Sequence, residues 1–252
     1  MGTDVRIVAL IEELAANAWP AYTQQSYGAW KLRATFGTTK RANSVFTVGP
    51  MPEDADWLRR IERFYQRRGL PVCFYVSDVS PDGLDAELAG QGYRLEMDCS
   101  LMLGRTGEVL ERVTDGGRFT FDCAEEADDS WIHDFMRLEA FPQERFAGYR
   151  HIFSAVGPEK SFVRVLEDGA TVGLGTVVAE RGFAGISNII VDPKHRRKGI
   201  AQQLLRALAV WAQDHEADRL YLQVIDDNAP AVTLYRQLGF DRISGHRYWI
   251  KP

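Results

Sequence analysis

The sequence of 252 residues places a cluster of cations directly before a predicted helix, in the stretch Val191-Asp192-Pro193-Lys194-His195-Arg196-Arg197-Lys198-Gly199-Ile200-Ala201. A helix N-terminus already carries partial positive charge, so each cation placed there opposes the helix by about 0.3–1 kcal/mol. The small side chains of Gly199 and Ala201 would let the backbone N–H groups of the first turn approach a ligand closely. The stretch therefore predicts a cradle for an anion such as a pyrophosphate; the alternative is a solvated surface run of bases.

The first half of the chain offers an internal comparison for this loop. When Gly92-Tyr93 is set over Gly239-Phe240, residues 72–94 align with residues 219–241 as strand, short helix and strand, which indicates a weak internal duplication. At the corresponding helix start, residues 49–56 read Gly-Pro-Met-Pro-Glu-Asp-Ala-Asp, and acids there suit the helix dipole. Only the second half is therefore predicted to bind an anion.

Two other phosphate-binding motifs are missing from the sequence. There is no G-K-S/T, which a nucleotide P-loop requires, and no G-x-G-x-x-G followed by an acid about 20 residues later. The pattern thus favours neither a nucleoside triphosphatase nor a nicotinamide enzyme.

Two segments, in order, resemble the signatures of the GNAT superfamily of N-acyltransferases. The family's cofactor loop has Gln or Arg, two residues, Gly, one residue, then Gly or Ala, and it is matched by Arg196, Gly199 and Ala201. Residues 228–240, which read Asn-Ala-Pro-Ala-Val-Thr-Leu-Tyr-Arg-Gln-Leu-Gly-Phe, are similar to the family's N-x-x-A-x-x-L-Y-x-x-L-G-F segment. The resemblance covers residues 119–251.

The resemblance implies acetyl-CoA as the acyl donor and a set of residues that bind it. The pantetheine arm would pair with the strand end formed by Ile189, Ile190 and Val191, because its amide groups need strand-like partners. The pyrophosphate would lie on the turn formed by Arg196, Arg197, Lys198, Gly199, Ile200 and Ala201. Asn228 has two interpretations of about equal weight, a cofactor contact or an ordinary helix N-cap.

Tyr235 is the position that, by the resemblance, protonates the departing CoA thiolate. A phenol can do so because its usual pKa is about 10 and that of a free thiol is about 8.5. The alternative is a core aromatic, since Ala231, Leu234, Tyr235 and Leu238 form one helical stripe. In the first half Leu88 takes the corresponding position, so packing there does not require a hydroxyl group.

The sequence does not identify a single general base. Many members of the superfamily have a glutamate in the strand that corresponds to residues 185–189, but here that stretch reads Gly-Ile-Ser-Asn-Ile. Glu139, Glu144 or an ordered water are the candidates to take the proton from an ammonium group. Three first-half residues could line a cleft between the halves and select the acceptor, or pair with surface charges instead: Arg33, Arg41 and Asn43.

The periodicity of apolar residues predicts a mixed α/β fold. Helices are expected over residues 5–18, 54–68, 84–89, 129–138, 144–155, 200–215 and 229–237. Strands are expected over residues 30–36, 44–48, 72–77, 93–103, 119–123, 161–166, 172–180, 184–191, 220–225 and 242–250. This order predicts a mostly antiparallel sheet flanked by helices, as tandem GNAT-like domains: residues 1–115, a degenerate copy, and residues 116–252, the catalytic domain.

Composition narrows the class of protein further. The net charge of −5 argues against a nucleic-acid partner, because phosphate binding needs a basic face. Three cysteines far apart encode neither a disulfide framework nor a zinc site, and no metal site is expected. Without a signal peptide or a long apolar run, we expect a cytoplasmic protein with no membrane association.

Together the residues favour an enzyme that transfers an acetyl group from acetyl-CoA to a small-molecule or peptide amine by direct attack. The alternative from another class is a non-catalytic acyl-CoA sensor or interaction module, which the missing strand glutamate keeps open. A homodimer is compatible with the sequence, which does not fix the oligomeric state.

Overall fold

The computed structural model describes residues 4–251 of the chain, which alternate between helices and strands throughout. The helices are α1 (Val5–Asn17), α2 (Trp57–Gln66), α3 (Leu84–Gly90), α4 (Thr106–Arg112), α5 (Asp129–Leu138), α6 (Phe146–Ser154), α7 (Ile200–Asp214) and α8 (Ala229–Gln237), with the 3-10 turns η1 (Gln143–Arg145) and η2 (Pro193–His195). The strands are β1 (Thr23–Tyr27), β2 (Trp30–Ala34), β3 (Val45–Phe46), β4 (Val72–Ser77), β5 (Arg94–Arg105), β6 (Thr120–Ala124), β7 (Glu159–Glu167), β8 (Ala170–Glu180), β9 (Phe183–Val191), β10 (Arg219–Ile225) and β11 (Asp241–Lys251). The mixed α/β prediction is confirmed.

The strands form one sheet of 11 strands in the order β1-β2-β3-β4-β11-β5-β10-β9-β8-β7-β6. Most neighbours are antiparallel; β3 with β4 and β9 with β10 are the parallel pairs. The predicted meander of three strands is confirmed as β7, β8 and β9, joined by the turns at Gly169 and Gly182. Both glycines have positive φ, which a residue without a side chain adopts at little cost.

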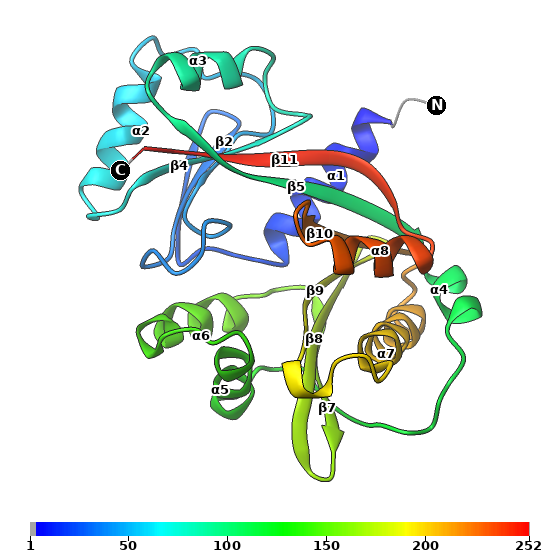
Figure 1. Ribbon diagram of the computed structural model, residues 1–252. Coiled ribbons are helices and arrows are strands. Elements are labelled where there is room, and N and C mark those ends of the chain that lie inside the picture. Colours follow the sequence, from blue (N-terminus) through cyan, green and yellow to red (C-terminus); the bar gives the residue numbers. More distant parts are fainter. Residues whose placement is uncertain (1–3, 252) are drawn as a thin grey trace.

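The two halves of the chain exchange their last strands at the centre of the sheet. β11 of the second half pairs with β4 and β5 of the first half, and β5 pairs on its other side with β10. Figure 1 shows β5 and β11 running side by side across the middle of the molecule. Strands from both sides of the predicted boundary at residues 115 and 116 therefore share one sheet. The division into two domains stays a prediction.

The internal duplication predicted from the sequence agrees with the arrangement of elements. β4, α3 and β5 recur as β10, α8 and β11, and the starts of β4 and β10, Val72 and Arg219, lie in the predicted register. The starts of β5 and β11, Arg94 and Asp241, keep that register.

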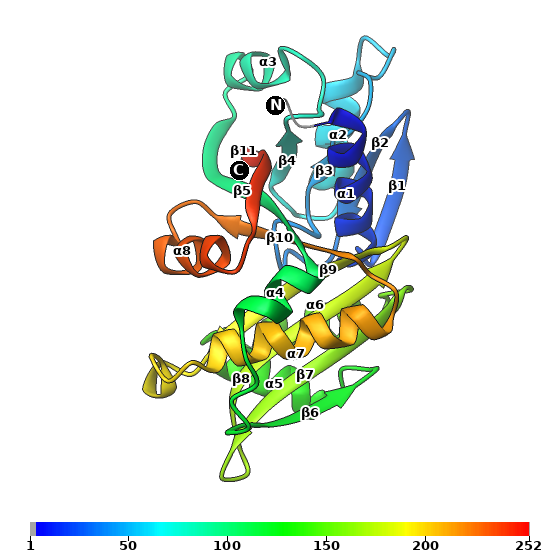
Figure 2. The same ribbon diagram turned by 90° about the vertical axis from the view of Figure 1, so that its right-hand side faces the viewer.

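Helices cover both faces of the sheet. Figure 1 shows β7, β8 and β9 between α5 and α6 on one side and α7 on the other; in Figure 2, α7 lies across β7 and β8 with α4 beside it. Strand alternation sends neighbouring side chains to opposite layers. On β10, for example, Tyr221 packs with α1, whereas Leu220 and Leu222 pack with α7.

Helix α1 lies on the same face as α5 and α6, over β5 and β10. Its Asp4 side chain caps the helix by accepting a hydrogen bond from the backbone N–H of Arg6. Its apolar face, formed by Val8, Ile11 and Leu14, packs on Leu101 of β5 and Tyr221 of β10. A first-half helix is thereby fixed over a strand of the second half.

One strand and one α-helix were not predicted. β1 is a polar edge strand, Thr-Gln-Gln-Ser-Tyr, whose side chains are mostly exposed, so it lacks the alternation by which strands are recognised. Helix α4 lies in residues 104–117, which were predicted as a polar connection; Val109 is its buried apolar contact with the core around α7. Tertiary packing, rather than the short local pattern, forms this helix.

Among the described residues, no helix has the length and apolar composition that crossing a bilayer requires.

Replacing Ile11 with alanine should destabilise the protein by about 2–5 kcal/mol, because it leaves a cavity between α1 and the sheet. Ile11 is fully buried, whereas Val5 on the same helix is 65% exposed. The control Val5→Ala should change the free energy of unfolding by less than about 0.5 kcal/mol. Urea denaturation measures both, and equal effects of the two substitutions would contradict the packing of α1.

Candidate active site

The predicted phosphate loop connects β9 to α7 through η2. Asp192 starts η2 by accepting a hydrogen bond from the backbone N–H of Lys194. Arg197 and Gly199 both have positive φ, 65° and 83°, so the chain turns sharply before the first turn of α7. A Cβ atom added to Gly199 would meet nothing within 4 Å, which leaves open space beside the start of the helix.

The N-terminus of α7 has no side-chain cap and no acid in its first turn. Asp4, Asp128 and Asn228 cap α1, α5 and α8 with their side chains, whereas the shorter helices α2, α3, α4 and α6 also lack a side-chain cap. The first N–H groups of a helix have no partner within the helix. Since α7 is the longest helix in the described part of the chain, its free end is a site to which an anion would be attracted.

The cations of the loop differ in how they are neutralised. Glu167, at the end of β7, accepts a hydrogen bond from Lys198 at 3.2 Å and lies 3.3 Å from His195. The Lys198 ammonium holds the pKa of Glu167 below its usual value. Arg196 and Arg197 are exposed and form no ion pair with any residue between 4 and 251. Two guanidinium groups thus remain free for a ligand.

The strand end next to this loop separates from its parallel neighbour. β9 and β10 pair only as far as Ile186 and Leu222, so residues 187–191, which include Ile189, Ile190 and Val191, lie beyond the ladder with β10. An irregularity in the pairing with β8 and the positive φ of Asn188, 56°, mark the point where β9 bends away. The bend leaves an edge of strand with which an extended, amide-bearing ligand could pair.

A small cavity lies at the point where the two strands separate, and we call it the strand-split cavity. It has a volume of about 20 Å³, enough for roughly one water molecule. Its lining comes from both halves of the chain: Ala15, Ala18 and Arg41 from the first, and Gly185, Ile186, Ser187, Tyr221, Leu222 and Gln223 from the second.

Tyr235 lies on α8 within the core that α7 shares with β10. It is 8% exposed, packs edge-on against Phe240, and belongs to the same apolar cluster as Leu222, with Ile189 and Val191 packed against that cluster. Burial raises the pKa of Tyr235 to about 12. The phenol therefore keeps its proton at neutral pH, as a proton donor must, and both interpretations, core aromatic and general acid, remain compatible with its position.

Asn228 caps α8. Its side-chain oxygen accepts a hydrogen bond from the backbone N–H of Ala231 at 3.3 Å. This is the capping interpretation predicted from the sequence, and the additional cofactor contact stays a prediction.

The two carboxylates predicted as bases lie outside the strand-split cavity. Glu139 ends α5 and Glu144 lies in η1, and both are exposed. Of the three first-half residues predicted to select the acceptor, Arg41 does line the cavity. Arg33 is buried and donates to Ser44, and Asn43 is buried and bonds to the backbone of residues 35–39. The hydrogen bonds of Arg33 and Asn43 thus stabilise the first-half loop over residues 35–44.

The corresponding place in the first half is closed. β3 and β4 are also parallel neighbours that separate, and they pair over two residues, Val45 with Phe74 and Phe46 with Tyr75. Just beyond, the buried hydroxyl of Thr47 donates to the backbone oxygen of Tyr75 at 2.8 Å, which uses the group that an extended ligand would need. With acids at the start of α2 as well, this half lacks the features of the α7 loop.

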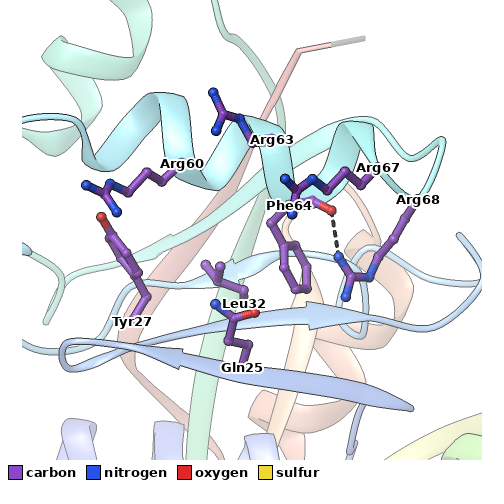
Figure 3. A pocket seen from close by; sticks show the side chains of 8 residues that line it. All are labelled: Gln25, Tyr27, Leu32, Arg60, Arg63, Phe64, Arg67 and Arg68. Carbon is purple, nitrogen blue, oxygen red and sulfur yellow. Dashed lines mark hydrogen bonds between the residues drawn. The ribbon is translucent and has the colours of Figure 1, made fainter.

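A larger cavity, of about 610 Å³, lies in the first half between α2 and the hairpin of β1 and β2. Figure 3 shows Arg60 and Arg63 on α2, and Arg67 and Arg68 just after its end, on the opposite side of the cavity from Gln25 and Tyr27. Its lining contains no second-half residue, so it is separate from the α7 loop.

Comparisons with known proteins agree with this geometry. The family model described as "Probable histone acetyltransferase Rv0428c C-terminal" matches residues 4–249. The chain is 46% identical over 241 residues to a protein of Bacillus subtilis (strain 168) named uncharacterized N-acetyltransferase YobR, covering 96% of this chain and 97% of that protein. Streptothricin acetyltransferase of Streptomyces lavendulae is 40% identical over 83 residues, 32% of this chain and 44% of that protein.

Solved structures resemble the whole chain at low sequence identity. A GCN5-related N-acetyltransferase from Kribbella flavida aligns with a TM-score of 0.70 at 17% identity, over 100% of this chain and 96% of that one. A tandem GNAT protein from the clavulanic acid biosynthesis pathway aligns with a TM-score of 0.67 at 12% identity, over 96% of this chain and 87% of that one. The relatives indicate N-acetyltransferase activity of the GNAT type, and the chain belongs to the GNAT superfamily, with two GNAT-like folds in tandem.

Proposed function

We propose that the protein transfers an acetyl group from acetyl-CoA to an amine, with residues 116–252 as the unit that binds the donor. The observation that carries this proposal is the N-terminus of α7, which has no side-chain cap and lies beside two exposed arginines, Arg196 and Arg197, that pair with no acid in the described part of the chain. A diphosphate would satisfy the helix N–H groups and both guanidinium groups together.

Each part of the split between β9 and β10 has a role in this proposal. The turn from Arg196 to Ala201, including Lys198, Gly199 and Ile200, holds the pyrophosphate. The free edge formed by Ile189, Ile190 and Val191 pairs with the pantetheine amides, which directs the thioester toward the point where β9 and β10 separate. Tyr235 returns a proton to the sulfur of the leaving thiolate, since its phenol is still protonated at neutral pH.

The acceptor side of the split is formed by both halves, because Arg41 and helix α1 cover it from the first half. The acidic composition of the chain, with a net charge of −5, suits a cationic acceptor. The direct test is release of free thiol from acetyl-CoA in the presence of a panel of small and peptide amines. Tight donor binding with no thiol release for any amine would favour a sensor instead.

The substitution Gly199→Asp should weaken acetyl-CoA binding by roughly tenfold or more, because it places a carboxylate against the pyrophosphate. Gly199→Asn is the matched control, since Asp and Asn tolerate positive φ similarly and differ here only in charge. Calorimetry with acetyl-CoA should show a much smaller loss for the asparagine variant. Equal affinities for the two variants would contradict the cradle.

Replacing Glu167 with glutamine should strengthen acetyl-CoA binding a few-fold at low salt. The carboxylate competes with a bound diphosphate for the Lys198 ammonium and the His195 imidazole, and its loss frees both side chains. The gain should disappear at about 1 M salt, where charges more than about 3 Å apart are screened. Weaker binding by the variant would mean that Glu167 holds the loop in its binding shape.

Tyr235→Phe should lower kcat by about 100-fold while changing KM for acetyl-CoA little, because a general acid acts in the transition state more than in binding. The phenylalanine ring keeps the contact with Phe240, so thermal unfolding should be nearly unchanged. An unaltered kcat would leave Tyr235 as a core aromatic.

A further inference from the structure

Helix α1 carries a carboxylate where its apolar face should be. Glu12 is fully buried, like its neighbour Ile11 on the helix face that packs on the sheet. Buried carboxylates are rare and costly unless they are bonded or protonated. A glutamate at this position therefore calls for a physical reason.

Glu12 is only half satisfied by its surroundings. Its Oε2 accepts a hydrogen bond of 2.5 Å from the hydroxyl of Tyr75, whereas its Oε1 is buried with no hydrogen-bond partner among the described residues. A carboxylate kept for structure alone would gain from a partner on both oxygens. The Oε1 atom of Glu12 is therefore left free to carry a proton.

The hydrogen bonds of Glu12 lead to the strand-split cavity. Gln223 of β10, which lines that cavity, donates from Nε2 to the oxygen of Tyr75 at 3.0 Å. Because the phenol oxygen accepts this bond, its own proton points to Glu12. The chain Gln223, Tyr75, Glu12 thus joins the place where β9 and β10 separate to a carboxylate of the first half, and β9 itself has no carboxylate at residues 183–191.

We propose that Glu12 is the proton acceptor for the incoming amine, reached from the strand-split cavity through Tyr75 and one water molecule beside Gln223. This inference rests on the proposed function. The ammonium group passes one proton to the water, the water passes one to the Tyr75 oxygen, and the Tyr75 proton moves to Glu12. The free amine then forms the C–N bond as the thioester C–S bond breaks. Tyr235 protonates the sulfur and is reprotonated from the nitrogen, and Glu12 later releases its proton to solvent.

The groups around Glu12 set the pH range of this role. Burial raises the pKa of Glu12 to about 7, while the Tyr75 hydrogen bond, the nearby Arg33 and the Ser77 hydroxyl lower it and Asp78 raises it. His246 stacks on Tyr75, and burial lowers the pKa of that imidazole to about 3, so it stays neutral. A base must be ionised, so activity should rise with pH through about 7.

The test compares Glu12→Gln with wild-type protein, using an alkylamine acceptor and an alkoxyamine analogue that is unprotonated at neutral pH. With the alkylamine, kcat should fall by about 100-fold, the rise through neutral pH should vanish, and the Kd for acetyl-CoA should not change. With the alkoxyamine, which needs no deprotonation before attack, the variant should retain most of the wild-type rate. Glu13→Gln is the matched control, since Glu13 is the exposed neighbour that pairs with Arg181.

The raised pKa of Glu12 also predicts how substitutions here change the stability and the pH profile. A carboxyl whose pKa is raised on folding binds its proton more tightly in the folded state, so its ionisation weakens the fold as pH rises above the unfolded value. Glu12→Gln should therefore be at least as stable as wild type at pH 8. Tyr75→Phe removes a hydrogen bond that lowers the pKa of Glu12, so any remaining pH profile should shift to higher pH.

Two results would overturn this inference and leave the proposed function intact. One is a wild-type rate and pH profile in Glu12→Gln; the other is an equal loss with both amines, which would indicate a structural role. If wild-type protein releases no thiol with any amine, the proposed function itself fails and this inference fails with it.

Discussion

The exchange of β5 and β11 is the constraint on which the rest of the structure depends. Each of these strands bonds its backbone groups on both sides to strands of the opposite half: β5 to β10 and β11, and β11 to β4 and β5. The halves are therefore parts of one sheet, and their relative position is fixed by a hydrogen-bond ladder. Helix α1, packed on Leu101 and Tyr221, is held over the split in the second half for this reason.

Within this shared frame, the two halves differ in electrostatics far more than in fold. The start of α2 follows a run of acids, and Thr47 closes the gap beside β4. The start of α7 follows a run of cations, and the edge of β9 beside β10 stays open. The same arrangement of strand, turn and helix is thus proposed to hold an anion in the second half, whereas in the first half its acids suit the helix dipole.

Burial has opposite chemical consequences for two groups near the split. It raises the pKa of the Tyr235 phenol to about 12, which keeps protonated the group that we propose as the proton donor. It raises the pKa of the Glu12 carboxyl to about 7, which brings a carboxylate into the range where it can exchange protons at neutral pH. In the proposed mechanism, burial in apolar surroundings thus prepares Tyr235 as the proton donor and Glu12 as the proton acceptor.

The sequence by itself determined the elements and the motifs that are local. The cations before Ile200, the segment from Asn228 to Phe240 and the register of the duplication are contained in short stretches, because helix starts, caps and strand alternation depend on neighbouring residues. Only the tertiary structure decided the exchange of strands, the formation of α4 and the place of Glu12. In the sequence Glu12 is one acid in an amphipathic helix. Only the packing of α1 against the sheet buries it on Tyr75, a residue far away in the chain, and only the bond from Gln223 to Tyr75 links it to the split.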